Sequence, residues 1–271
     1  MINTTQVVGE ANITALSADT PWNYSVDPYL NPLACVYCAS LQMNLNVVVE
    51  TNGGATQNFW VQNVLSFYNT QEQEMSSLSG LVFNMTVPHA NITSTAYGSG
   101  RLGTLGGQTT YAFGSLGGVV YSYSLPLAIT LRTSVSLSPD HRGIKLSLSD
   151  LPLESANFGS VFLPIRNATS VRIVVSPYAL IPYGFKLEGS YDAELVWAAF
   201  CCGQVANFQE MNSTLSLSYL NASGKLVPFP SFYTFGSDTG ESAANLVVLP
   251  TQNGGRVVQI SGTDNNTMLH R

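Results

Sequence analysis

Two carboxylates stand close together in the run YDAELVW at residues 191–197. On a strand, Asp192 and Glu194 would point to the same face, because side chains two residues apart share a face. Two carboxyls in an apolar strand are costly unless they are hydrogen-bonded, protonated or used. In acid, one could ionise while the other keeps its proton, which would supply a base and an acid for water attack on an amide or glycosidic bond. The alternative is an edge strand with two solvated carboxylates.

A second acidic pair, Asp238 and Glu241, lies in the run SDTGES at residues 237–242. Asp-Thr-Gly resembles the catalytic triplet of pepsin-like aspartic proteases, but those enzymes carry it in two related lobes and this sequence has it once. A pepsin fold is therefore not expected, and the triplet is also typical of an ordinary turn. Both residues remain candidates for a carboxylate dyad.

Other catalytic chemistries find little support in the sequence. The three histidines are scattered at positions 89, 141 and 270, without metal-binding spacing, and no nucleophile-elbow motif occurs. A histidine base would also be charged in acid and could not accept a proton. We therefore expect no metal and no cofactor. The net charge of −6 and the lack of basic clusters argue against nucleic acid.

The elements that would position these residues are strands. Residues 41–49 alternate apolar and amide side chains, which predicts a strand with Gln42 on its amide face. Residues 57–68 include the run QNFWVQNV, whose alternation would place Trp60 and Gln62 on one face. An Asn-Gly-Gly turn signal at 52–54 separates the two runs, so they should form an antiparallel hairpin.

The remaining chain also has the pattern of an all-β protein. Further strands are expected at 80–87, 119–137, 144–148, 159–164, 170–176, 190–200, 213–220, 244–249 and 256–260. The glycine-dense stretch 98–118 predicts a loop beside a groove. We expect one domain over residues 1–271, folded as a large antiparallel β-sandwich of jelly-roll or concanavalin-like type, with residues 1–33 as an arm over the sandwich.

Composition indicates an exported protein that works in acid. Only 10% of the residues are charged, against about 25% in ordinary proteins. With ten Lys and Arg, the positive charge stays small even when every carboxylate is neutral. Nine N-x-Ser/Thr triplets make glycosylation a hypothesis, and the four cysteines predict one or two disulfides between Cys35/Cys38 and Cys201/Cys202. A secreted protein with a glycan-compatible surface would share this composition. No apolar run is long enough to span a membrane.

Several stretches together resemble the thermopsin family, the secreted acid proteases of thermoacidophilic archaea. They are residues 40–44, 59–64, 192–196 and 235–242, of which the W-x-Q-N-V and D-T-G-E runs are the most specific. The resemblance implies an extracellular acid endopeptidase that acts on denatured protein in a hot, acidic medium. One departure from the family is the run AAFCCG at 198–203, where a loop rich in glycine and proline would be expected.

A Gln and a Glu in a sandwich groove also resemble the glutamic peptidases. By that analogy, Glu194 would act as base toward water and then as acid toward the leaving amine, while Gln62 would stabilise the oxyanion. The competing carboxylates are Asp192, Asp238 and Glu241, and Trp60 and Gln42 would line the groove. The expected partner is a polypeptide, bound by a monomer. A carbohydrate-active or carbohydrate-binding sandwich and a non-catalytic surface-layer protein remain alternatives.

Overall fold

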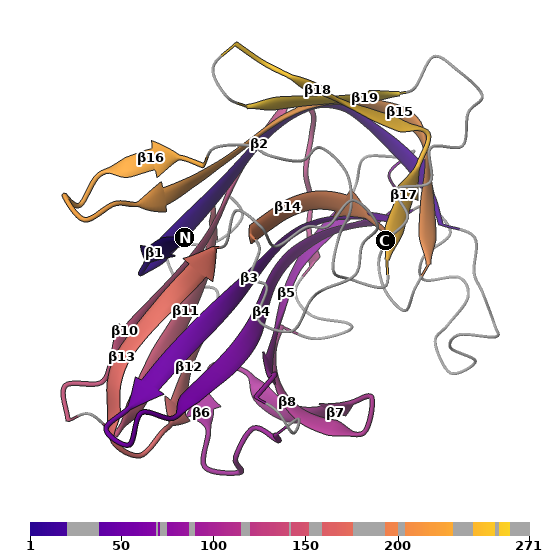
Figure 1. Ribbon diagram of the computed structural model, residues 1–271. Helices are drawn as coiled ribbons and strands as arrows, with labels where there is room; N and C mark the ends of the chain where they lie inside the picture. The colour runs from indigo at the N-terminus through magenta and orange to yellow at the C-terminus, as the bar shows by residue number, and fades with distance from the viewer. Residues whose placement is uncertain are drawn as a thin grey trace.

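The protein is built from two large β-sheets packed face to face (Figure 1). The computed structural model describes residues 1–20, 38–68, 70, 75–86, 90–114, 120–140, 142–151, 159–175, 193–199, 204–229, 241–252 and 255–260. All the regular structure within these ranges is strand, which confirms the predicted all-β sandwich. Within them, no helix has the length and apolar character needed to cross a membrane.

The first sheet, called sheet A, has nine strands. Its path runs in the order β1 (Ile2–Thr4), β13 (Ala168–Val175), β3 (Ala39–Thr51), β4 (Thr56–Tyr68), β5 (Met75–Asn84), β8 (Gln108–Phe113) and β7 (Arg101–Leu105). Two strands lie off this path: β14 (Ala193–Ala198) pairs with β3, and β9 (Val120–Tyr121) pairs with β5. Sheet A therefore has β3 at its centre, with β13 and β14 along one side and β4 along the other.

The second sheet, sheet B, has ten strands. Its path runs in the order β18 (Leu246–Pro250), β19 (Arg256–Ile260), β15 (Val205–Leu220), β2 (Gln6–Asp19), β10 (Leu127–Leu137), β11 (Gly143–Leu151), β12 (Gly159–Pro164) and β6 (Tyr97–Gly98). The short strands β16 (Leu226–Pro228) and β17 (Ser242–Ala244) pair with β15. The first 20 residues thus enter the sheets as β1 and β2, and β2 is paired on both sides. Residues 21–33 of the expected arm lie outside the described residues.

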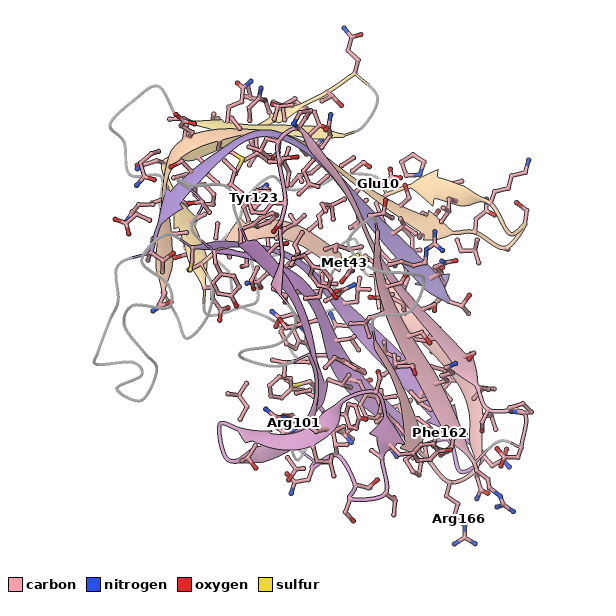
Figure 2. All side chains as sticks on the ribbon, turned by 180° about the vertical axis from the view of Figure 1, so that it is seen from behind. Glu10, Met43, Arg101, Tyr123, Phe162 and Arg166 are labelled. Atoms are coloured by element: carbon pink, nitrogen blue, oxygen red, sulfur yellow. The ribbon has the colours of Figure 1, made fainter. Side chains whose placement is uncertain are left out.

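The core fills the space between the sheets, and alternation decides which residues enter it. The odd-numbered apolar residues of β3, from Leu41 to Val49, are fully buried. Figure 2 shows Met43 between the layers, and its Sδ lies so close to Gly9 of β2 that a Cβ there would sit 3.2 Å away. Trp197 of β14 donates from Nε1 to Ser213 Oγ of β15 across 3.0 Å. The even-numbered residues of β3 and β14 therefore point away from sheet B.

The predicted hairpin of β3 and β4 is present, with a continuous antiparallel register from Ala39↔Phe67 to Glu50↔Thr56. The expectation of a loop over residues 98–118 was wrong, because residues 101–113 form the β7–β8 hairpin. Its turn is Gly106-Gly107, with φ angles of 58° and 79°. Consecutive positive φ angles are what the tightest hairpin turns require, and glycine adopts them without strain.

Candidate active site

The proposed Gln62 and Glu194 lie on either side of one residue of β3. Asn44 is the register partner of Gln62 on β4 and of Glu194 on β14. Residues directly opposite each other in an antiparallel pair point to the same face. Gln62, Asn44 and Glu194 therefore form a row across three strands, on the face of sheet A turned away from sheet B. We call it the polar row; with neighbouring strands about 4.8 Å apart, its ends are about 10 Å apart.

Glu194 is held by an amide and is almost completely buried. Asn44 Nδ2 donates to Glu194 Oε2 across 3.0 Å, and the two residues are 1% and 6% exposed. Burial disfavours the charged form of a carboxyl, whereas an N–H donor favours it. Glu194 is thus a buried carboxyl held by one N–H donor, a group that can carry a proton between a water molecule and a leaving amine.

Gln62 is held by a chain of hydrogen bonds that runs along β3, here called the glutamine chain. Gln62 Nε2 donates to Gln42 Oε1 across 2.9 Å, and Gln42 Nε2 donates to Ser40 Oγ across 2.9 Å. Ser40 Oγ in turn donates to the carbonyl oxygen of Ala199 across 2.6 Å. A carbonyl oxygen can only accept a hydrogen bond, so the Ser40 hydroxyl must donate to it. The Ser40 oxygen then accepts from the Gln42 amide nitrogen, and the Gln42 amide oxygen accepts from the Gln62 amide nitrogen. Gln62 Nε2 keeps a second hydrogen that the glutamine chain does not use.

Trp60 lies on the same face, one step along β4 from Gln62. Its ring meets that of Phe83 on β5 edge to face, with centroids 5.6 Å apart and planes at 60°. Both aromatic residues are partly exposed, whereas Gln62 is 8% exposed and Gln42 is 1% exposed. The face is therefore more open at its Trp60 end than at its Gln42 end.

The other proposed carboxylates are not brought to the polar row by any described contact. Asp192 and Asp238 lie outside the described residues. Glu241 is partly exposed and directly precedes β17, where Ser242 accepts a hydrogen bond at its carbonyl oxygen from Ala199 N across 3.1 Å. Ala199 is five residues beyond Glu194, which is about 16 Å along an extended chain. Glu241 therefore lies near the Ala199 end of β14, away from the polar row.

Sequence reasoning noticed the amide face of β3 but gave no role to Asn44 or Ser40. Their parity with Gln42 shows that they share its face. The missing information was the pairing of β14 with β3, a contact between residues 150 positions apart. Once that pairing is known, Asn44 is seen to be the amide that lies beside the carboxylate of Glu194.

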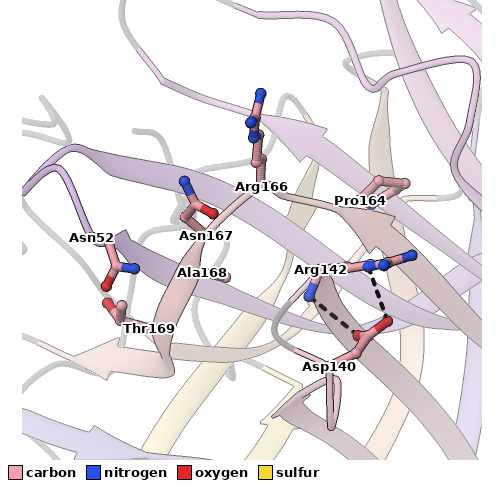
Figure 3. A pocket seen from close by; sticks show the side chains of 8 residues that line it. All are labelled: Asn52, Asp140, Arg142, Pro164, Arg166, Asn167, Ala168 and Thr169. Carbon is pink, nitrogen blue, oxygen red and sulfur yellow. Dashed lines mark hydrogen bonds and ion pairs between the residues drawn. The ribbon is translucent and has the colours of Figure 1, made fainter.

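A separate hollow of about 880 Å³ lies at the turn end of the sandwich (Figure 3). Its lining residues are Asn52, Asp140, Arg142, Pro164, Arg166, Asn167, Ala168 and Thr169. Hydrogen bonds from the Ser138 hydroxyl and from the Arg142 backbone lower the pKa of Asp140. Asn52 is eight residues from Asn44, about 26 Å along the chain. The hollow contains none of the proposed site residues.

The predicted disulfides and the expected absence of a metal can be compared with the described residues only in part. Cys38 is buried at the start of β3, and the other three cysteines lie outside the described residues, so the proposed disulfides remain predictions. Within the described ranges, no cluster of three or more His, Cys, Asp or Glu side chains could hold a metal ion.

Comparison with known proteins agrees with the resemblance noted in the sequence. The sequence model of the family described as Thermopsin matches residues 1–246. The thermopsin of Sulfolobus acidocaldarius is 30% identical over 280 aligned residues, which cover 99% of this chain and 76% of that protein.

Proposed function

Because this chain belongs to the thermopsin family of acid proteases and is a peptidase, we propose that Glu194 and Gln62 hydrolyse peptide bonds in unfolded polypeptides at low pH. The polar row is the observation that carries the proposal, because it aligns a buried carboxyl and a non-titrating amide on one face of sheet A.

Glu194 acts first as a base and then as an acid. Its carboxylate removes one proton from a water molecule while the water oxygen bonds to the carbonyl carbon of the substrate. The carbonyl oxygen becomes an oxyanion. When the C–N bond breaks, the proton held by Glu194 passes to the departing amine nitrogen. One water is consumed, and Glu194 returns to its ionised form, so the chemistry needs neither a metal nor a covalent intermediate.

Gln62 stabilises the oxyanion with the Nε2 hydrogen that the glutamine chain leaves unused. An amide keeps its donors at every pH, whereas a carboxyl loses its donor when it ionises within the working range. Gln42 and Ser40 keep the amide nitrogen, rather than the oxygen, turned in a fixed direction. Pre-oriented donors of this kind typically contribute about 10²–10³-fold to the rate.

A carboxylate dyad is the alternative mechanism within the same function. Asp192 precedes Glu194 by two residues, so an extended chain would bring both to one face. Asp238 and Glu241 are the other candidates for the second carboxyl. In each case two nearby carboxyls would share one proton and would still activate water without a metal.

We further propose that the enzyme is a single-domain, exported monomer that works outside the cell and binds no nucleic acid. The small number of Lys and Arg residues supports an acidic setting, because it limits self-repulsion when the carboxylates are neutral. Five exposed sequon asparagines support glycosylation; they are Asn3, Asn12, Asn91, Asn167 and Asn212. The Trp60–Phe83 pair supports binding of substrate side chains at the open end of the face.

The test is cleavage of an acid-unfolded protein at pH 2–4 by wild type and single variants. Glu194→Gln should abolish cleavage, and Gln62→Ala should lower kcat by about 10²-fold. Glu210→Gln is the matched control, because Glu210 is an exposed carboxylate on sheet B. If Glu194→Gln keeps full activity while Asp192→Asn, Asp238→Asn or Glu241→Gln loses it, the assignment to Glu194 is wrong.

A further inference from the structure

Asn44 lies between the two proposed catalytic residues, and only part of its amide is engaged. Nδ2 donates to Glu194 Oε2. Oδ1 is buried and has no hydrogen-bond partner among the residues that the structure describes. A buried acceptor without a donor is unfavourable, and native proteins rarely keep one without a use. Its position in the middle of the polar row indicates what that use is.

The Nδ2 contact decides which oxygen of Glu194 takes part in proton transfer. An N–H group can donate only to an oxygen that presents a lone pair, so Oε2 faces the Asn44 amide. Protonation of Oε2 would weaken it as an acceptor for Asn44, so Oε1 is the favoured position for a proton that Glu194 takes up. The contact also stops the carboxyl from rotating, so Oε1 stays in one place when it accepts a proton and later returns it.

The Oδ1 atom offers a place for the water. Gln62 and Glu194 are separated by two strand spacings, about 10 Å between their Cα atoms. A water between them, above Asn44, has one hydrogen to give to Glu194 Oε1 and a second hydrogen that needs an acceptor. Asn44 Oδ1 is a neutral acceptor in that position, and it cannot take the proton away.

We propose that Asn44 is a third residue of the site, whose Nδ2 orients Glu194 and whose Oδ1 accepts one hydrogen of the attacking water. The inference rests on the proposed role of Glu194. Of the titratable side chains described on this face of β3, β4, β13 and β14, only Glu194 adjoins Asn44. Glu50 and Arg172 pair with each other toward the turn end of β3, and Tyr68 ends β4.

Two substitutions separate the roles of the amide. Asn44→Leu removes both the donor and the acceptor. Asn44→Asp keeps the shape: in its neutral form Asp can donate to Glu194 and still accept from water, but in its ionised form it repels the Glu194 carboxylate. Asn46→Leu is the matched control, because Asn46 is the next amide on the same face of β3 and its register partner is Trp60, not Glu194.

The experiment measures kcat and KM for an unfolded peptide between pH 1 and 6, with circular dichroism at each pH to confirm folding. Asn44→Leu should lower kcat by about 10²-fold with little change in KM. It should also shift the acidic limb of the profile to higher pH, because the donor that favours ionised Glu194 is gone. Asn44→Asp should keep much of the activity at the lowest pH. As the pH rises, its activity should fall at a lower pH than that of the wild type. Asn46→Leu should keep the pH dependence of kcat that the wild type has.

The outcomes distinguish this inference from the proposed function. If Glu194→Gln is inactive but folded Asn44→Leu has the wild-type profile, the role of Asn44 is wrong and that of Glu194 stands. If Asn44→Leu does not fold, Asn44→Asp decides, and a wild-type profile for it overturns the inference. If Glu194→Gln is fully active, the assignment of the catalytic carboxyl to Glu194 is wrong, and the role of Asn44 is wrong with it.

Discussion

Asn63 of β4 donates from Nδ2 to Asp150 Oδ1 of β11 across 3.0 Å, and this hydrogen bond joins the two sheets through the interior. The residues are 0% and 1% exposed. Asn63 follows Gln62 directly, so the two neighbouring amides of β4 face opposite ways. One belongs to the proposed active site, and the other belongs to the core that supports it.

Breaking the Asn63–Asp150 contact should destabilise the fold. Asn63→Leu leaves the buried Asp150 carboxyl without this donor, and the expected loss is about 1–3 kcal/mol. The double variant Asn63→Leu/Asp150→Leu should lose less than the sum of the two single variants, because neither member of this pair is then left without the other. Urea unfolding of all four proteins at pH 3 measures this coupling. Strictly additive losses would show that the contact contributes nothing.

Alternation in the sequence was sufficient to predict β3 and β4 and the faces of their residues. The same rule could have found Asp150, because Ile144, Leu146 and Leu148 are the inward residues of β11 and position 150 continues their series. It did not do so because a carboxyl at the end of a strand is usually solvated. An inward position is therefore worth checking even when its residue is polar.

Apart from the β3–β4 hairpin, the sequence did not indicate which strands pair with each other. Alternation says which face a residue occupies, but it does not say which strand lies beside it. β14 could have paired with many strands, and the Asn44–Glu194 contact depends on that choice alone. The same limit explains why the sequence predicted an arm where β2 lies. The chain after β2 is rich in turn residues and suggested an arm, but the 14 residues of β2 pair with β10 and β15 in the middle of sheet B.

Ser40→Ala should lower activity without unfolding the protein. The substitution removes the 2.9 Å hydrogen bond that Gln42 donates to Ser40. Only the longer contact of 3.4 Å from Gln42 Nε2 to the Ala199 carbonyl oxygen then orients the amides of Gln42 and Gln62. We expect kcat to fall by about 10-fold, with less than about 1.5 kcal/mol lost in stability, the usual range for one hydrogen bond. The measurements are kcat on an unfolded peptide at pH 3 and urea unfolding.

Ser66→Ala is the matched control for the Ser40 variant. Ser66 is buried on β4 directly opposite Ser40 but takes no part in the glutamine chain. It should keep the wild-type kcat. Equal kcat values for wild type and Ser40→Ala would show that the glutamine chain does not orient Gln62 for catalysis.

Glu50 should support the fold at neutral pH but not at the working pH. Hydrogen bonds from Arg172 and Ser170, together with the Arg172 charge, lower the pKa of Glu50 from its ordinary value of 4.5. Stability gained from a lowered carboxyl pKa is fully present above that ordinary value and is lost as the pH falls through the folded-state value. Glu50→Gln should therefore lower Tm at pH 7 and leave it unchanged at pH 2. A loss of equal size at both pH values would exclude this ion pair as the cause.

Trp60→Ala should weaken substrate binding more than it slows the chemistry. The Trp60 ring is partly exposed beside Phe83, one step from Gln62, but it has no group that could exchange a proton. We expect KM for an unfolded peptide to rise about 10-fold, which corresponds to the loss of one well-packed aromatic contact. Trp60→Phe keeps a ring in that place and should raise KM less. If both variants lower kcat and leave KM unchanged, Trp60 supports the polar row and does not bind substrate.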